Sequence, residues 1–142
     1  MCIFCQIIAG EAEASFVHQD KLCVAFMNLR PINPGEFMVI PRAHIDHFTD
    51  LSDDLAAHIM LVAQRLGRHM QATLSPRRVG YVVHGFGVPH AHLNVVPLMH
   101  SNDIISGKHV QVHDTGFEVT LAGLAAPNRA ELDAMAARLR LP

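Results

Sequence analysis

Two histidines and an asparagine alternate with apolar residues in the segment 89–97, whose letters are PHAHLNVVP. Successive side chains of a β-strand point to opposite faces, so His90, His92 and Asn94 would line one polar row. The pKa of imidazole, about 6.5, lets a neutral histidine act as nucleophile, base or metal ligand near pH 7. The prolines at both ends of the segment favour a short buried strand over a solvated one. We therefore expect a small reactive site on this strand.

A second group with chemical potential is the pair Cys2 and Cys5. The spacing fits a zinc half-site, a redox dithiol or two cysteines that pack as small hydrophobes. Redox dithiols of the thioredoxin type follow a strand, and no strand precedes this pair, which speaks against the redox interpretation. Structural zinc needs four sulfur or nitrogen ligands, and His44 and His90 are the candidates to complete the set. Spacing alone leaves zinc binding and simple packing both open.

The loop before the histidines contains Gly85 and Gly87. Glycines let backbone N–H groups approach an anion closely, so this loop is a candidate phosphate cradle. The alternative is an ordinary β-turn with Phe86 buried in the core. The chain has no Walker loop, dinucleotide fingerprint or nucleophile-elbow serine.

Composition sets limits on the class of protein. The chain has 142 residues, of which 50% are hydrophobic and 17% charged, with a net charge of -2. This length suits a single domain with its own core. The weak charge favours neither nucleic acid nor a membrane surface as a partner. No apolar run reaches the roughly 20 residues of a membrane span. The odd count of three cysteines suits a reducing compartment, so we expect a cytoplasmic protein.

The first 40 residues predict one short helix and three strands. Residues 2–10 suit a helix of one or two turns that ends at Gly10. Residues 15–19 and 22–27 have strand patterns on either side of a turn and predict a hairpin. Residues 37–40 predict a buried strand. These elements must position the two candidate sites.

Two longer helices and one further strand are predicted in the rest of the chain. Ser52 is the expected N-cap of a helix that runs to about Thr73 with one apolar stripe. Residues 79–83 predict a strand. Asn128, with Glu131 three residues on, predicts the start of a C-terminal helix.

The polar residues outside the candidate sites receive simpler interpretations. His58 and His69 lie in the long helix without partners at metal-ligand spacing, so we expect solvated or packing side chains. In residues 99–123, Val110 and Val112 alternate with His109, Gln111 and His113, which predicts an edge strand. The whole pattern predicts an α+β fold, a mostly antiparallel five-stranded sheet with a long central helix and a C-terminal helix. We expect all the helices to pack on one side of this sheet.

The segment His90–Val96 resembles the signature of the histidine triad (HIT) family, in which three histidines alternate with apolar residues. Three further blocks match the family in the same order, namely residues 2–11, 25–31 and 34–44. The resemblance covers the first hundred residues, which divides the single domain 1–142 into a family core, 1–98, and a variable C-terminal extension, 99–142. It implies the HIT fold and a homodimer across one sheet edge.

The resemblance also implies an activity. Family members hydrolyse or transfer nucleoside monophosphates from substrates such as nucleoside phosphoramidates and dinucleoside polyphosphates. His92 corresponds to the nucleophile that forms a nucleotidyl-histidine intermediate, and the backbone carbonyl of His90 to the group that orients it. Asn28 corresponds to the ribose contact. The apolar slot for the base corresponds to Phe4, Ile7, Phe26 and Leu29.

Members with the N-terminal cysteine pair often bind zinc, and the corresponding ligands here are Cys2, Cys5, His44 and His90. With all four positions filled by protein, the zinc would be structural, which argues against a catalytic metal. No organic cofactor is implied.

The chain departs from the family pattern at two places. Asn94 stands where a third histidine is usual; an amide can contact a phosphate oxygen but cannot carry a proton. The polar segment that usually precedes the triad is replaced by residues 85–88. Two hypotheses follow: a nucleotide hydrolase or transferase, and a nucleotide-binding or scaffold protein with weakened catalysis.

Overall fold

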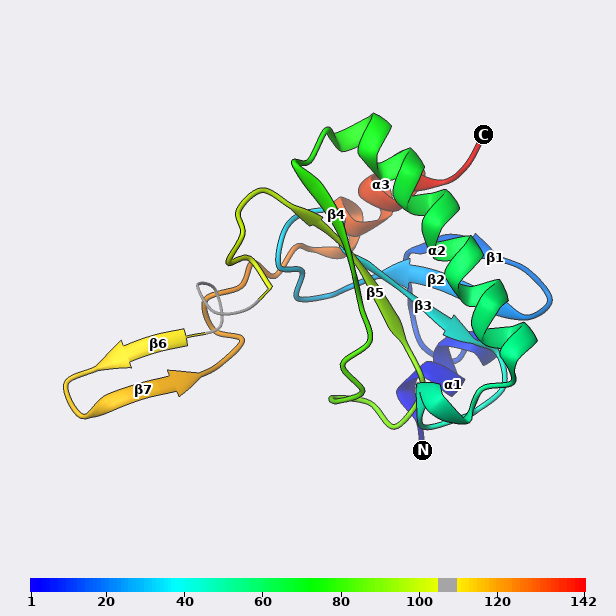
Figure 1. Ribbon diagram of the computed structural model, residues 1–142, viewed down its shortest axis with the longest axis horizontal. Helices are drawn as coiled ribbons and strands as arrows, with labels where there is room; N and C mark the ends of the chain where they lie inside the picture. The colour runs from blue at the N-terminus through cyan, green and yellow to red at the C-terminus, as the bar shows by residue number, and fades with distance from the viewer. Residues whose placement is uncertain (105–109) are drawn as a thin grey trace.

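The computed structural model of the protein describes residues 1–104 and 110–142. The described residues form a five-stranded antiparallel sheet, a separate two-stranded hairpin and three α-helices (Figure 1). The main sheet has the order β1-β2-β3-β5-β4. Its strands are β1 (Phe16–Gln19), β2 (Cys23–Met27), β3 (Phe37–Pro41), β4 (Arg78–Val82) and β5 (Leu93–Leu98). All four strand pairings are antiparallel, which confirms the predicted α+β fold.

Two helices cover one face of this sheet, α2 (Asp53–Leu74) and α3 (Arg129–Leu139). As predicted, Ser52 caps α2, since its side chain accepts a hydrogen bond from the N–H of Leu55. Asn128 and Glu131 form a capping box at the start of α3, also as predicted. Both caps satisfy N–H groups that a helix start otherwise leaves without partners.

The third helix, α1 (Ile3–Ala9), packs on the opposite face of the sheet. The chain leaves the helix at Gly10, whose φ of 77° lies in the left-handed region that glycine tolerates. The prediction that helices cover only one side was wrong. The reason lies in β2, whose five residues are all buried, so that both faces of this strand need an apolar cover.

Strand β5 begins at Leu93, three residues later than His90. The prediction of a strand over the whole polar row was therefore wrong at its N-terminal end. The N–H of Ala91 donates to the carbonyl of Ile45, in the loop after β3, rather than to a strand neighbour. The alternation nevertheless persists in this extended lead-in, because Ala91, like Leu93, packs in the core on the α2 side.

The strand predicted around Val110 and Val112 is present, but none of the described residues of 99–123 joins the edge of the main sheet. Instead, β6 (Val110–His113) pairs with β7 (Gly116–Val119) in a hairpin that lies away from the main sheet in Figure 1. Val112 and Phe117 are 83% and 76% exposed, so the apolar side chains of this hairpin bury little surface. His109 lies outside the described residues.

The part of the chain that the structure describes contains no helix long and apolar enough to cross a membrane.

Candidate functional site

His92 is held in one orientation by the backbone. Its Nδ1 lies 2.7 Å from the carbonyl oxygen of His90. A carbonyl only accepts hydrogen bonds, so Nδ1 carries the proton and the lone pair of the neutral ring is on Nε2. The side chain is buried, with the ring of Phe4 edge-on at a centroid distance of 5.7 Å. The geometry leaves one nitrogen of His92 fit to act as a nucleophile.

The four sequence-nominated zinc ligands come together beside His92. The ligand atoms of Cys2, Cys5, His44 and His90 all lie within 4.8 Å of one another. The Nδ1 of His90 is 3.6 Å from Sγ of Cys2 and 3.7 Å from Sγ of Cys5. The Nδ1 of His44 is 3.3 Å from Sγ of Cys5. Tetrahedral zinc with ordinary bond lengths would separate sulfur and nitrogen ligands by about 3.6 Å.

The second ring nitrogen of His90 shows that this histidine can bind a metal. Its Nε2 donates to the carbonyl of Pro41 over 2.9 Å, which leaves Nδ1 without a proton and facing the two sulfur atoms. Burial lowers the pKa of His90, the hydrogen bond to Pro41 opposes this, and the neighbouring His44 and His92 lower the pKa further. The neutral form favoured by burial is the form that a metal requires.

His90 therefore connects the two groups of residues. Its ring belongs to the cysteine and histidine cluster, and its carbonyl orients His92. A shift of the His90 backbone would therefore affect both the cluster and the acceptor that sets the tautomer of the candidate nucleophile.

Asn28 and Asn94 both contact a buried carboxylate, Glu36. The Oε1 atom of Glu36 accepts hydrogen bonds from Nδ2 of Asn28 and from Nδ2 of Asn94, each over 2.9 Å. Its Oε2 accepts from the N–H of Ile32 over 2.6 Å. Glu36 is only 2% exposed. The ribose contact and the phosphate contact that the family resemblance implies are thus joined through one carboxylate oxygen.

Sequence reasoning missed Glu36. A signal was present in the sequence, because Glu36 stands immediately before the apolar strand β3 and is therefore expected to be buried. Glutamate is seldom fully buried without hydrogen-bond partners. The partner Asn94 is 58 positions away in the chain, and only the pairing of β3 with β5 brings the two together.

Three of the four residues proposed for the base slot pack together. Phe4, Ile7 and Phe26 are buried in one cluster between α1 and the sheet, with the rings of Phe4 and Phe26 at a centroid distance of 5.3 Å. Leu29 is 57% exposed after the end of β2 and is not among the residues of this cluster. The structure therefore groups the slot residues of α1 and β2 with each other but not with Leu29.

Gly85 and Gly87 have φ angles of 80° and 95°, a conformation that favours glycine. Between them, Phe86 is 75% exposed and tilted against His84, so the interpretation of Phe86 as a core residue was wrong. The loop reaches the cysteine and histidine cluster across an open groove. The groove, of about 360 Å³, is lined by Met1, Cys2, Ile3, His44, Gly87, Val88 and Pro89.

Comparison with known proteins agrees with the fold. The HIT domain matches residues 9–101. An uncharacterized HIT-like protein of Mycobacterium tuberculosis is 31% identical over 105 residues, which cover 68% of this chain and 70% of that protein. The crystal structure of a HIT-like protein from Bartonella henselae has a TM-score of 0.77 at 19% identity and covers 98% of this chain and 94% of its own.

A Zn-bound histidine triad family protein from Mycobacterium smegmatis is similar as well. Its structure has a TM-score of 0.72 at 26% identity and covers 97% of this chain and 94% of its own. The domain match over residues 9–101, the relative in M. tuberculosis and the shared fold lead to one conclusion: the chain belongs to the HIT domain family.

Proposed function

We propose that the protein is a nucleotide hydrolase or transferase that cleaves at the α-phosphate of a nucleoside phosphoramidate, a dinucleoside polyphosphate or a similar nucleotide. The observation that carries the proposal is the 2.7 Å contact between Nδ1 of His92 and the carbonyl of His90. This contact fixes the tautomer in which Nε2 is a nucleophile, and family membership supports a nucleotide as the substrate class.

The reaction would take place in two displacements. First, the Nε2 lone pair of His92 attacks the α-phosphorus, a nitrogen–phosphorus bond forms, and the bond from phosphorus to the leaving group breaks. The leaving group departs with the electron pair and takes up a proton. Water then attacks the same phosphorus and loses a proton, and the nitrogen–phosphorus bond breaks. This releases the nucleoside monophosphate and returns the lone pair to Nε2. In a transferase another acceptor replaces water.

Positive charge develops on the imidazole during the first displacement. The Nδ1–H of His92 donates to the His90 carbonyl, and this hydrogen bond strengthens as the ring becomes positive. The backbone of His90 thus stabilises the charged intermediate without transferring a proton.

Asn28 and Asn94 would hold the ribose and the phosphate. Each amide nitrogen has two hydrogens, and each donates one of them to Glu36. The second hydrogen on Nδ2 of Asn94 would donate to a phosphate oxygen. The Oδ1 of Asn28, which already accepts from the N–H of Arg30, has a further lone pair for a ribose hydroxyl.

We also propose that Cys2, Cys5, His44 and His90 bind a structural zinc ion. The sulfur-to-nitrogen distances of 3.3 to 3.7 Å fit tetrahedral coordination, and the M. smegmatis relative is described as Zn-bound. The ion would link α1 to the segment that holds His92, and it would take no part in the displacements. The chain's own contribution is the Pro41 carbonyl, which keeps Nδ1 of His90 turned toward the sulfur atoms.

The exposed edge of β4 supports the expectation of a homodimer. This strand ends the sheet, and Tyr81 is 40% exposed on it while Val83, just beyond, is 46% exposed. A second copy that pairs along this edge would bury both side chains. Light scattering should give twice the 15.6 kDa mass of the chain, and Val83→Lys should lower this measured mass. A monomer at micromolar concentration would contradict the dimer.

The cytoplasmic location stays a prediction.

Turnover of adenosine 5′-phosphoramidate tests the proposed activity. We expect His92→Ala to lower kcat by roughly a thousandfold or more while nucleotide binding persists. His69→Ala is the matched control, because His69 lies on α2 and its Nε2 contacts the Arg138 carbonyl, away from His92. Turnover that survives in His92→Ala contradicts the proposal. Binding without turnover in the unaltered protein supports the alternative of a nucleotide-binding or scaffold protein.

A further inference from the structure

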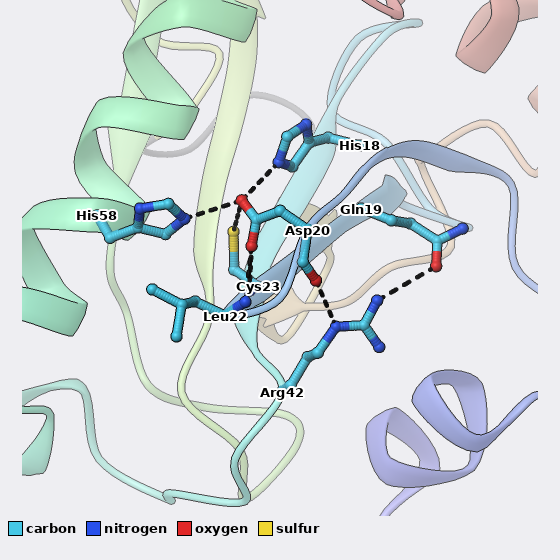
Figure 2. Close-up of polar contacts among 7 residues, drawn as sticks. All are labelled: His18, Gln19, Asp20, Leu22, Cys23, Arg42 and His58. Atoms are coloured by element: carbon cyan, nitrogen blue, oxygen red, sulfur yellow. Dashed lines mark hydrogen bonds and ion pairs between the residues drawn. The ribbon is translucent and has the colours of Figure 1, made fainter.

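A second cluster of metal-binding residue types surrounds the turn between β1 and β2. Figure 2 shows His18, Asp20 and Cys23 from this hairpin together with His58 from α2. The Oδ2 atom of Asp20 lies 2.8 Å from Nε2 of His18 and 2.8 Å from Nε2 of His58. The Sγ of Cys23 lies 3.5 Å from the same oxygen. His58 was predicted to be only a solvated or packing residue, and this prediction missed its contact with Asp20.

The backbone fixes the orientation of the Asp20 carboxylate. Its Oδ1 accepts hydrogen bonds from the N–H groups of Leu22 and Cys23, each over 2.8 Å. The Nε of Arg42 donates to the carbonyl of Asp20 over 2.6 Å and holds the turn from outside (Figure 2). Because Oδ1 is occupied by the turn, Oδ2 faces the two imidazoles.

An irregularity in β1 brings His18 to this place. The pairing of β1 with β2 shifts register between Phe16 and His18, which is typical of a β-bulge. Phe16 packs in the cluster on the α1 side, whereas Val17 packs in the core on the α2 side. Regular alternation would return His18 to the side of Phe16, but the bulge turns it toward α2, where His58 lies. Bulges often redirect a side chain in this way next to functional sites.

We propose that His18, Asp20 and Cys23, completed by His58, form a second metal site that binds a transition-metal ion such as Zn²⁺ or Co²⁺. The ligand atoms of the three hairpin residues lie within 4.8 Å of one another. A set of imidazole, carboxylate and thiol ligands favours such ions over Mg²⁺ or Ca²⁺, which prefer oxygen ligands alone. The second imidazole, that of His58, reaches the site from α2, where its Nε2 already contacts Asp20.

The burial of the cluster suits entry of an ion from one side. The side chains of His18 and Asp20 are each 26% exposed, and that of His58 is 33% exposed. Cys23 is fully buried beneath them. A hydrated ion would therefore meet the imidazoles and the carboxylate first and the sulfur last.

Metal binding at this cluster would replace hydrogen bonds by coordination. Each imidazole would move its proton from Nε2 to Nδ1, and Cys23 would release its proton to solvent. Burial, with the charge of Asp20, raises the pKa of the Cys23 thiol to about 12, so the bound ion must supply the charge that ionises it. The ion would tie the β1–β2 hairpin to α2, a structural role separate from the chemistry at His92.

Cobalt absorption tests this site in a chain with a single cysteine. The protein has three cysteines, so the variant with Cys2→Ser and Cys5→Ser retains only Cys23, and any cobalt–thiolate absorption band must come from that residue. We expect one equivalent of Co²⁺ to produce the band. Cys23→Ala in this background should abolish it. His58→Gln should weaken Co²⁺ affinity by roughly tenfold or more, and His69→Gln, the matched helix control, should not.

Zinc stoichiometry of the chain with its first site intact provides a second measurement, which decides the question if the double-serine variant does not fold. We expect Asp20→Asn to lose one equivalent of Zn²⁺ per chain, and His69→Gln to lose none. The asparagine keeps the oxygen that accepts from Leu22 and Cys23, so the turn should persist. Equal zinc content in the unaltered chain and Asp20→Asn, or a folded double-serine variant without a thiolate band, would overturn the proposal.

Discussion

The amide nitrogen of Asn94 donates a hydrogen bond to Oε1 of the buried Glu36 over 2.9 Å. The same oxygen accepts a hydrogen bond from Nδ2 of Asn28. Asn94, which stands where the family has a histidine, therefore has a specific hydrogen-bond partner in Glu36. Its amide donates to this carboxylate without adding a positive charge. The contact makes Glu36 the residue that positions both amides.

Glu36→Ala should destabilise the protein. The change removes the carboxylate that accepts hydrogen bonds from two partly buried amide groups and from the N–H of Ile32. We expect the free energy of unfolding, measured in urea, to fall by about 2–4 kcal/mol. Glu11→Ala, at an exposed position, is the control and should change it little. A loss equal to that of the control would show that Glu36 does not hold these groups.

Asn94→His alone should not raise turnover. The imidazole would lie against the Glu36 carboxylate, which favours its positive form and holds it away from the phosphate. We expect kcat for adenosine 5′-phosphoramidate to fall, and the double variant Asn94→His with Glu36→Gln to recover part of the loss. A single Asn94→His variant that is faster than the unaltered protein would contradict this account of Glu36.

Zinc removal should reduce stability and activity together. Cys5→Ser, or treatment with a strong chelator, frees the His90 ring, and the carbonyl that orients His92 belongs to the same residue. We expect a lower Tm and a kcat reduced roughly 10–100-fold, with recovery when zinc is returned to the chelated protein. Full activity in a protein shown to be free of zinc would mean that the orientation of His92 does not depend on the cysteine and histidine cluster.

The stability of the metal-free protein should depend on Asp20 in a pH-dependent way. Burial alone raises the pKa of this carboxyl, but hydrogen bonds from His18, the N–H groups of Cys23 and Leu22, and His58 outweigh burial and lower the pKa. A lowered pKa contributes stability above the unfolded value of about 4, and this contribution is lost as pH falls toward the folded value.

Asp20→Asn in the presence of chelator is the corresponding test. We expect it to lower the free energy of unfolding by about 2 kcal/mol at pH 7, with the difference shrinking as the pH falls below about 4. Asp114→Asn, at an exposed position, should show no such trend. A difference that stays constant down to low pH would mean that the ionised carboxylate is not what stabilises the turn.

Local signals in the sequence predicted most of the fold. Ser52, Asn128 and Gly10 end or begin helices through contacts within a few residues, and such contacts are visible in the sequence. The pairing of β6 with β7 was not predicted, because the alternation of apolar and polar residues does not show which strand is the partner. The start of β5 was misplaced because the N–H of Ala91 finds its acceptor in a distant loop.

The candidate site was predictable only in part. The grouping of His44 with the cysteines was nominated by ligand chemistry and by the family resemblance, and the structure brings these side chains together. Glu36 and the bulge before His18 depend on strand pairing and register, which one sequence does not specify. The contacts that distinguish this chain from the family pattern therefore came from the structure.

Peptide mapping after rapid quenching identifies the residue that carries the covalent intermediate. The protein is mixed with adenosine 5′-phosphoramidate, stopped within one turnover, digested without acid and examined by tandem mass spectrometry. We expect an adenylyl group on the peptide that contains His92, attached to that residue. Turnover without any adenylylated peptide, or an adenylyl group on another residue, would contradict this expectation.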